Sequence, residues 1–225
     1  MITSSELKSL AHHLGADRCG IAGIDRFSGA PEGFRPTDIW KDCRSVVAFL
    51  KRLPPDVILP ENPVPYTRAA HILYEELDQL SMRLSFELEK EGIRSVMVPC
   101  DDPYLYWDEE NMYGRAILSM RHAAKNAGLG ILGRNTLLIN RDFGNMVYIG
   151  ALLLGTELEP DPPAEDFACP PGCSLCLDAC PVRALDGITV NQKLCRERSC
   201  MKHPRGWDIY SCSACRKVCP YRNGV

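Results

Sequence analysis

The chain has 225 residues, 12 cysteines and a formal net charge of −3. This length allows one large domain, or one domain with a small appendage, and is ample to bury a core. The mild acidity gives no electrostatic footprint for a nucleic acid, and no stretch approaches the roughly 18 apolar residues that a membrane-spanning helix needs. The first residues also lack the basic start and apolar core of a signal peptide. We therefore expect a cytoplasmic protein that does not enter a membrane.

Helical and strand patterns alternate through the first two thirds of the chain. A capping-box spacing at Thr3 and Glu6 predicts a first helix, and leucines at helical spacing predict a long amphipathic helix. In chain order, the predicted elements are a helix over 3–14, strands over 19–24 and 45–50, a helix over 67–91, a strand over 93–99, a helix over 112–127, and strands over 136–140 and 146–154 that are joined by a hairpin-like turn at 141–145. This alternation predicts a layered fold of the α/β or α+β class.

The cysteines divide the chain into two parts. Three of them are scattered over the first 168 residues, and nine fall between Cys169 and Cys219. A proline-rich stretch over 157–172 separates the parts, and its composition predicts a stiff, extended linker. We therefore predict a cysteine-poor domain over 1–157 and a cysteine-rich domain over 158–225. In a reducing compartment, so many cysteines indicate metal binding rather than disulfides.

Two related cysteine phrases occupy the second part. The phrases are Cys169-Pro-Pro-Gly-Cys173-Ser-Leu-Cys176-Leu-Asp-Ala-Cys180-Pro181 and Cys212-Ser-Ala-Cys215-Arg-Lys-Val-Cys219-Pro220. Both end in the Cys-x3-Cys-Pro of the two-cluster ferredoxin signature, in which the last cysteine binds the other cluster. The pattern therefore predicts two 4Fe–4S clusters. The first would be held by Cys169, Cys173, Cys176 and Cys219, and the second by Cys180, Cys212 and Cys215 with either Cys195 or Cys200.

A pair of zinc sites is the alternative interpretation of the same cysteines. Zinc ribbons also use Cys-x2-Cys pairs with four thiolate ligands, but they have no use for a third cysteine followed by proline, which occurs here twice. The pattern therefore favours iron–sulfur clusters. One irregularity remains, because three residues rather than two separate Cys169 from Cys173, which makes Cys169 the least regular ligand.

The stretch Ala127-Gly-Leu-Gly-Ile-Leu-Gly-Arg-Asn-Thr-Leu-Leu-Ile-Asn140, with Phe143, Gly144, Gly150 and the cysteine layout over 169–220, resembles the epoxyqueuosine reductases. These are relatives of the corrinoid-dependent reductive dehalogenases. The resemblance implies a nitroreductase-like α/β domain that holds a base-off cobalamin, followed by a ferredoxin-like domain with two clusters. It implies that Cys195 rather than Cys200 is a cluster ligand, and that a proton donor lies at Asp101 or Asp102. The implied contacts to the cobalamin are in the glycine-rich segment, at Gly128, Gly130, Gly133, Asn135 and Thr136.

The chain also departs from the pattern of these relatives. Epoxyqueuosine reductases usually continue past the clusters into a helical region that contacts tRNA, whereas this sequence ends six residues after Cys219. We therefore expect a short member of the superfamily. The region after Asp102 is longer and aromatic, and we interpret its rings as core or interface, with a lid over a flat ligand as the alternative. These aromatic residues are Tyr104, Tyr106, Trp107 and Tyr113. Asp-Asp-Pro is also a good turn initiator, which is the ordinary alternative to a proton donor.

These observations together predict an iron–sulfur oxidoreductase. Electrons from a reduced ferredoxin or flavodoxin would pass through the two clusters to a cofactor, for which cobalamin is the candidate, and reduce a small organic substrate. The alternatives are an electron-transfer protein without its own substrate and a truncated epoxyqueuosine reductase acting on tRNA. The 168 residues before the first cluster ligand favour an enzyme over a carrier. The acidity and the shorter C-terminal part make tRNA an unexpected partner.

Overall fold

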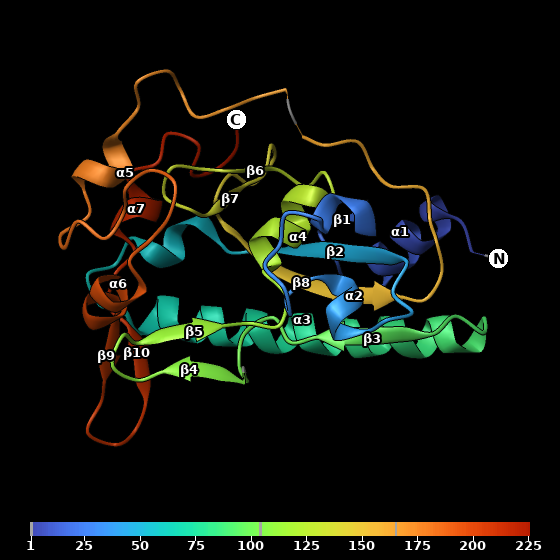
Figure 1. Cartoon of the computed structure of the whole chain (residues 1–225). Coiled ribbons are helices and arrows are strands. Elements are labelled where there is room, and N and C mark those ends of the chain that lie inside the picture. The colour runs from blue at the N-terminus through green and yellow to red at the C-terminus, as the bar shows by residue number, and fades with distance from the viewer. Residues whose placement is uncertain (1, 104, 165) are drawn as a thin grey trace.

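The computed structural model describes residues 2–103, 105–164 and 166–225. At its centre lies a four-stranded sheet in the order β1-β2-β8-β3, in which all neighbouring strands are antiparallel (Figure 1). The strands are β1 (Arg18–Gly23), β2 (Ser45–Arg52), β3 (Ser95–Val98) and β8 (Val147–Leu154). The predicted mixture of helices and strands is confirmed, and the antiparallel pairing places the fold in the α+β rather than the α/β class.

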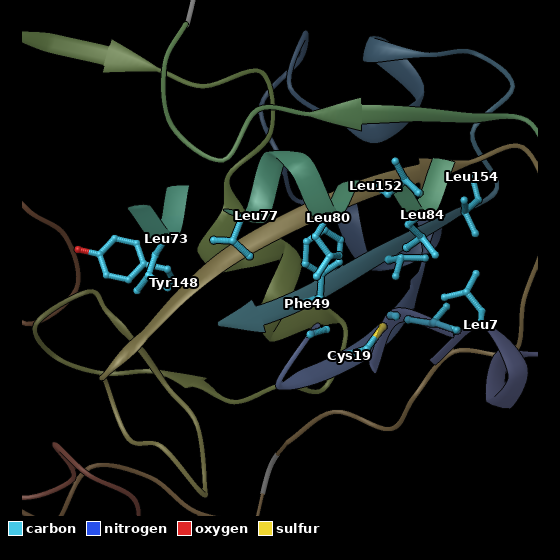
Figure 2. Close-up of a cluster of buried hydrophobic side chains, with 14 of the residues drawn as sticks. Leu7, Cys19, Phe49, Leu73, Leu77, Leu80, Leu84, Tyr148, Leu152 and Leu154 are labelled. Atoms are coloured by element: carbon cyan, nitrogen blue, oxygen red, sulfur yellow. The ribbon is translucent and has the colours of Figure 1, made fainter. Parts of the chain in front are cut away.

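Helices cover both faces of this sheet. Side chains that alternate along β2 point to opposite faces, and both sets are buried. Val47 and Phe49 lie on the face that α1 (Ser4–His13) and α3 (Val64–Lys90) cover. Figure 2 shows Phe49 packed among the α3 leucines. The opposite face packs on α4 (Met120–Asn126). Burial on both faces explains why β2 and β8 are continuous apolar runs instead of alternating ones.

Shorter elements complete the fold. Those of the first part are η1 (Ile24–Phe27), α2 (Pro36–Ile39), η2 (Pro55–Ile58), β4 (Tyr106–Asp108), β5 (Tyr113–Arg115), β6 (Ile131–Leu132) and β7 (Leu138–Ile139). Those of the cysteine module, as we call residues 169–225, are α5 (Leu175–Asp178), α6 (Gln192–Ser199), β9 (Cys200–Lys202), β10 (Asp208–Tyr210) and α7 (Ala214–Lys217). The cysteine module lies at one end of the sheet and beside the first half of α3 (Figure 1).

Two predicted elements differ from the structure. The helix expected over 112–127 begins only at Met120, because residues 113–115 form β5 and pair with β4. That hairpin is held from outside, since the Gln192 side chain accepts a hydrogen bond from the Gly114 amide (3.2 Å) and donates to its carbonyl (3.3 Å). The strands expected on either side of 141–145 are also not partners. β7 pairs with β6 and β8 with β2 and β3, so only a bridge between Asn140 and Gly144 remains of the hairpin.

The proline-rich linker runs back along the first strand. The Asp161 carboxylate accepts a hydrogen bond from the Ile21 amide (2.9 Å) and forms an ion pair with Lys8 (2.5 Å). The carbonyl of Asp161 accepts a further bond from Arg26 (2.7 Å). These contacts hold the linker against the sheet before it enters the cysteine module. Within the described ranges, no helix is both long and apolar enough to cross a membrane.

We predict that Leu84→Ala on α3 lowers the free energy of unfolding by about 2–5 kcal/mol, the usual cost of truncating a fully buried leucine. Leu84 is fully buried against the sheet, whereas Phe86, two residues away, is 54% exposed. Anaerobic urea denaturation followed by circular dichroism measures the change. Phe86→Ala is the matched control and should change the free energy by less than about 1 kcal/mol. Equal losses in the two variants would contradict the packing of α3.

Candidate metal centres and active site

Four cysteines from both phrases line one cavity. Cys169, Cys173 and Cys176 come from the first phrase and its short helix α5, and Cys219 comes from the end of the second phrase. Burial raises the pKa of the Cys176 thiol, and the charges of the other three raise it further, as expected for thiols that face one another. The structure therefore brings together the cysteines that the sequence pattern assigns to a first cluster, including the irregularly spaced Cys169.

A second group forms beside the first. Cys195, on α6, lies close enough to Cys212 and Cys180 for their charges to raise its pKa, and we call such residues electrostatic neighbours. Cys215 has Cys195 and Cys212 as its electrostatic neighbours. The neighbours of Cys215 also include Cys176 of the first group, so the two groups are adjacent. Adjacent groups that share one module are the arrangement in which an electron can pass from one cluster to the other.

Cys200 lies apart from these thiols. It begins β9, and its Sγ donates a hydrogen bond to Asp208 (3.5 Å). Its electrostatic neighbours are Asp208, Lys202 and Arg196 rather than the ligand cysteines. Of the two residues that the cysteine pattern left open, the structure thus gathers Cys195 with the second group. Within the described residues, no three His, Cys, Asp or Glu side chains converge on a single-ion site.

The glycines of the segment 127–140 are required for close packing within the chain itself. A Cβ on Gly128 would collide with the carbonyl oxygen of Pro162 in the linker, and one on Gly130 would collide with the carbonyl oxygen of Ile139. A Cβ on Gly133 would lie 2.7 Å from the Ile139 side chain. The positions where side chains would stand on these glycines are filled by the protein's own atoms, so packing within the chain is sufficient to explain the glycines. Their contact with a cobalamin stays a prediction.

The polar residues of the same segment hold the cysteine module. Arg134 donates a hydrogen bond to the Cys173 carbonyl (2.6 Å), and the buried Asn135 donates to the Cys215 carbonyl (3.3 Å). Arg134 and Asn135 also line the cavity of the first cysteine group. Thr136 lies one step further from the thiols, with φ at +61°, and its hydroxyl and carbonyl oxygens accept hydrogen bonds from Arg121. Sequence reasoning missed the role of Arg134, although it stands inside the stretch that carries the resemblance.

The loop after β3 places the two candidate acids in different environments. Asp101 is half-buried and Asp102 is exposed. Burial raises the pKa of the Asp101 carboxyl to about 6, and the neighbouring charge of Asp102 acts in the same direction, while Arg196 opposes it. A carboxyl with this pKa is partly protonated near neutral pH and can act as a proton donor. The structure therefore favours Asp101 over Asp102 for that role.

A group of tyrosines connects this acid with both parts of the chain. Tyr66 and Tyr74 come from α3, Tyr148 from β8 and Tyr210 from β10 in the cysteine module. The ring centroids of Tyr74 and Tyr148 lie 4.9 Å apart in an edge-to-face contact, and those of Tyr66 and Tyr210 lie 6.2 Å apart. In Figure 2 the hydroxyl of Tyr148 points away from the leucine core, at the end of the sheet that adjoins the module. Asp101 is an electrostatic neighbour of both Tyr74 and Tyr210.

The aromatic run after Asp102 forms an exposed hairpin instead of core. Tyr106 and Trp107 are 43% and 40% exposed on β4, and Tyr113 is half-buried on β5. The Arg115 guanidinium lies 4.8 Å from the Tyr106 ring, and Arg196 of α6 lies 5.2 Å from the Trp107 ring. The hairpin therefore contacts the cysteine module. Tyr104, the first aromatic residue of the run, is outside the described residues.

Comparison with known proteins finds relatives in sequence and in fold. No family model matches the chain. In sequence it is similar to the epoxyqueuosine reductase of Leadbetterella byssophila (26% identity, covering 98% of this chain and 80% of that protein) and to that of Staphylococcus aureus (34% identity, 52% and 33%). In structure it resembles the epoxyqueuosine reductase of Streptococcus thermophilus (TM-score 0.69, 23% identity, 100% and 67% coverage) and a catabolic reductive dehalogenase (TM-score 0.67, 17% identity, 98% and 32% coverage).

These similarities confirm the resemblance that the sequence predicted. The relatives found by sequence are named epoxyqueuosine reductases, which are oxidoreductases. The fold is similar to that of solved epoxyqueuosine reductases and of a reductive dehalogenase. The chain spans only a part of the length of most of these relatives, with 63% of the Bacillus subtilis enzyme covered.

The prediction that tRNA is an unexpected partner is wrong. The sequence relatives are epoxyqueuosine reductases, and one similar structure is that of such an enzyme with an epoxyqueuosine-modified tRNA stem loop (TM-score 0.63, 21% identity, 97% of this chain and 64% of that one). The physical reason lies in averaging the charge over the whole chain. Residues 190–225 carry eight Lys and Arg against two Asp and Glu, a net +6 that the total of −3 conceals. Local charge, not net charge, attracts a phosphate backbone.

We predict that Cys219→Ser lowers the iron content of the anaerobically reconstituted protein from about eight to about four per chain, because one of two four-iron clusters loses a ligand. The remaining thiols of that cavity, in the other phrase, would no longer close the site. Iron and sulfide analysis measures the loss. Cys200→Ser is the matched control and should keep about eight irons. Loss of iron from Cys200→Ser but not from Cys195→Ser would show that Cys200, and not Cys195, is the fourth ligand of the second group. Zinc in place of iron, with no sulfide, would contradict both clusters.

Proposed function

We propose that this chain is an iron–sulfur reductase of the epoxyqueuosine reductase type, which acts on a modified nucleoside in tRNA. One observation carries the proposal. Eight cysteines gather in two adjacent groups of four. Arg196, the residue after Cys195, is an electrostatic neighbour of the half-buried Asp101, whose pKa of about 6 leaves it partly protonated near neutral pH. Homology over 98% of the chain to an epoxyqueuosine reductase supports the substrate class.

The proposal assigns the first 4Fe–4S cluster to Cys169, Cys173, Cys176 and Cys219 and the second to Cys180, Cys195, Cys212 and Cys215. When bound, the clusters would supply single electrons at low potential. The surrounding chain holds them in place, since Arg134 and Asn135 bond the backbone carbonyls of one ligand in each group. The same proposal divides the chain into a nitroreductase-like domain over 1–157 and a ferredoxin-like domain over 158–225.

The chemistry of an epoxide defines what the site must deliver. Reducing an epoxide takes two electrons and two protons, whether the ring opens to an alcohol or loses its oxygen as water. The clusters, when bound, would relay these electrons singly from an external one-electron reductant. Asp101 supplies one proton to the oxygen as the carbon–oxygen bond breaks and recovers it from solvent, and solvent supplies the second proton. Burial of the acid, which has Tyr74 and Tyr210 as electrostatic neighbours, raises its pKa into the useful range.

Cobalamin is the further cofactor that the resemblance implies. One structural neighbour is a reductive dehalogenase whose structure suggests a mechanism for B12-dependent dehalogenation. The glycines of segment 127–140 give this cofactor no support of their own, because the positions where their Cβ atoms would stand are filled by the chain's own atoms. The proposed function therefore rests on the clusters and on Asp101. Titration with hydroxocobalamin, followed by absorbance, tests the corrinoid separately from the reductase activity.

We predict that the reconstituted chain, reduced with dithionite, converts an epoxyqueuosine-containing tRNA stem loop to the two-electron-reduced nucleoside. Nucleoside mass spectrometry measures the product, with and without added hydroxocobalamin. Cys180→Ser should abolish turnover, because it removes a ligand of one cluster and leaves the first group complete. Fully loaded clusters that accept electrons without product in either condition would contradict the proposal and favour an electron carrier.

We predict that the rate of this reduction falls as the pH rises above about 6, since Asp101 then loses its proton. Asp101→Asn should lower turnover by about 100-fold or more, the usual contribution of a general acid, and remove this limb of the pH profile. Asp102→Asn is the control, and it should keep the maximum rate while the limb moves to lower pH, because the charge of Asp102 helps to raise the pKa of Asp101. An unchanged limb in Asp101→Asn would assign the proton to another group.

A further inference from the structure

A hairpin of the cysteine module projects from the rest of the chain. It consists of β9 and β10, residues 200–210, and its tip over 202–207 extends away from the body of the fold (Figure 1). The tip exposes Trp207 (54% exposed) and the cationic residues Lys202 and Arg205. Neither the cysteine groups nor Asp101 explains why this loop has such a composition.

The tip carries a preformed stack of flat groups. The rings of His203 and Trp207 lie parallel within 19°, with centroids 5.0 Å apart. The Arg205 guanidinium lies 4.8 Å from the centroid of the Trp207 ring. Backbone bonds hold the loop in shape, because the His203 amide donates to the Trp207 carbonyl (2.8 Å) and the Gly206 amide donates to the His203 carbonyl (2.8 Å). Because the loop and its stack are already ordered, little conformational entropy is lost when a ligand binds there.

The charge at the tip is positive within a positive segment. Lys202, whose side chain is 76% exposed, pairs with Asp208 (2.5 Å), so part of its charge is compensated. Arg205 adds a second cation beside the stack. Residues 190–225 as a whole carry a net +6, whereas the remaining 189 residues carry a net −9. A polyanion would accordingly be attracted to this part of the chain and repelled from the rest.

The hairpin adjoins the loop that carries the proposed acid. Tyr210, at the root of the hairpin, is an electrostatic neighbour of Asp101, and Lys202, where the tip begins, is one of Asp102. A ligand held at the tip therefore lies on the same side of the molecule as Asp101. A binding site at the tip and a proton donor near the root suit a substrate that is much larger than its reacting group.

We infer that the hairpin tip, residues 202–207, is an RNA-docking surface that takes an unpaired base of a stem loop. The base extends the stack of His203, Trp207 and Arg205, since aromatic rings and arginine planes both accept unstacked bases. Lys202 and Arg205 contact the neighbouring phosphates. The identity of the RNA as a tRNA stem loop rests on the proposed function. An acidic partner protein would be attracted by the cations but would not need the aromatic stack. The presence of both cations and stack therefore favours RNA.

The test is the affinity of the cluster-loaded, unreduced chain for a fluorescein-labelled tRNA stem loop, measured by fluorescence anisotropy. Trp207→Ala should weaken binding by about 10-fold or more, as the loss of one stacked base does, and Trp207→Phe should restore most of it. Lys202→Ala with Arg205→Ala should lower the slope of log affinity against log salt by about one for each cation removed. A duplex of equal length should bind the unaltered chain more weakly than the stem loop.

Phe86→Ala and Lys90→Ala on α3 are the matched controls, because Phe86 is as exposed as Trp207 and Lys90 is an exposed cation. Both should leave the affinity unchanged, and iron content verifies that every variant is intact. Unchanged affinity in Trp207→Ala overturns the inference, as does a defect confined to reduction by an acidic donor protein. Since no turnover is needed, a chain that binds through the tip but reduces nothing removes only the proposed function. A chain that reduces the stem loop with normal affinity in Trp207→Ala removes only this inference.

Discussion

The buried guanidinium of Arg216 joins the cysteine module to the sheet domain. It follows Cys215 directly and donates a hydrogen bond to the carbonyl of Asn145, whose side-chain amide donates to the Arg216 carbonyl (3.3 Å). Its charge also lies 5.7 Å from the centroid of the Tyr148 ring. A buried charge is tolerated only with such compensation. The reciprocal bonds therefore fix the second phrase relative to β8, and the first phrase follows because the two phrases share the cysteine groups.

This junction brings the parts of the candidate site together. Segment 133–145 bonds both cysteine phrases, and Tyr66 of α3 lies beside Tyr210 of the module. Asp101, on the loop after β3, has Tyr74 of α3 and Tyr210 as electrostatic neighbours. The environment of this acid is thus made by two parts of the chain that are distant in sequence.

Much of the fold follows from local patterns. The leucines of α3 and the buried runs of β2 and β8 define elements close to their observed bounds, because burial of a face imposes its period on the residues. The failures have a common cause. β5 is stabilised by Gln192, which lies 78 residues from Gly114, and β7 pairs with β6 rather than β8. Short strands depend on such distant partners and leave little periodic signal of their own.

The sequence by itself predicted the chemistry of the thiols, because the spacing of two interlocked cysteine phrases is a local property of the chain. It also determined the resemblance, through the stretch 127–140. Only the tertiary structure decided that Cys195 and not Cys200 joins the second group, since that choice depends on how α6 packs. It likewise separated Asp101 from Asp102 by burial and gave the glycines a packing role. Burial and proximity arise from contacts between distant segments, which no local pattern encodes.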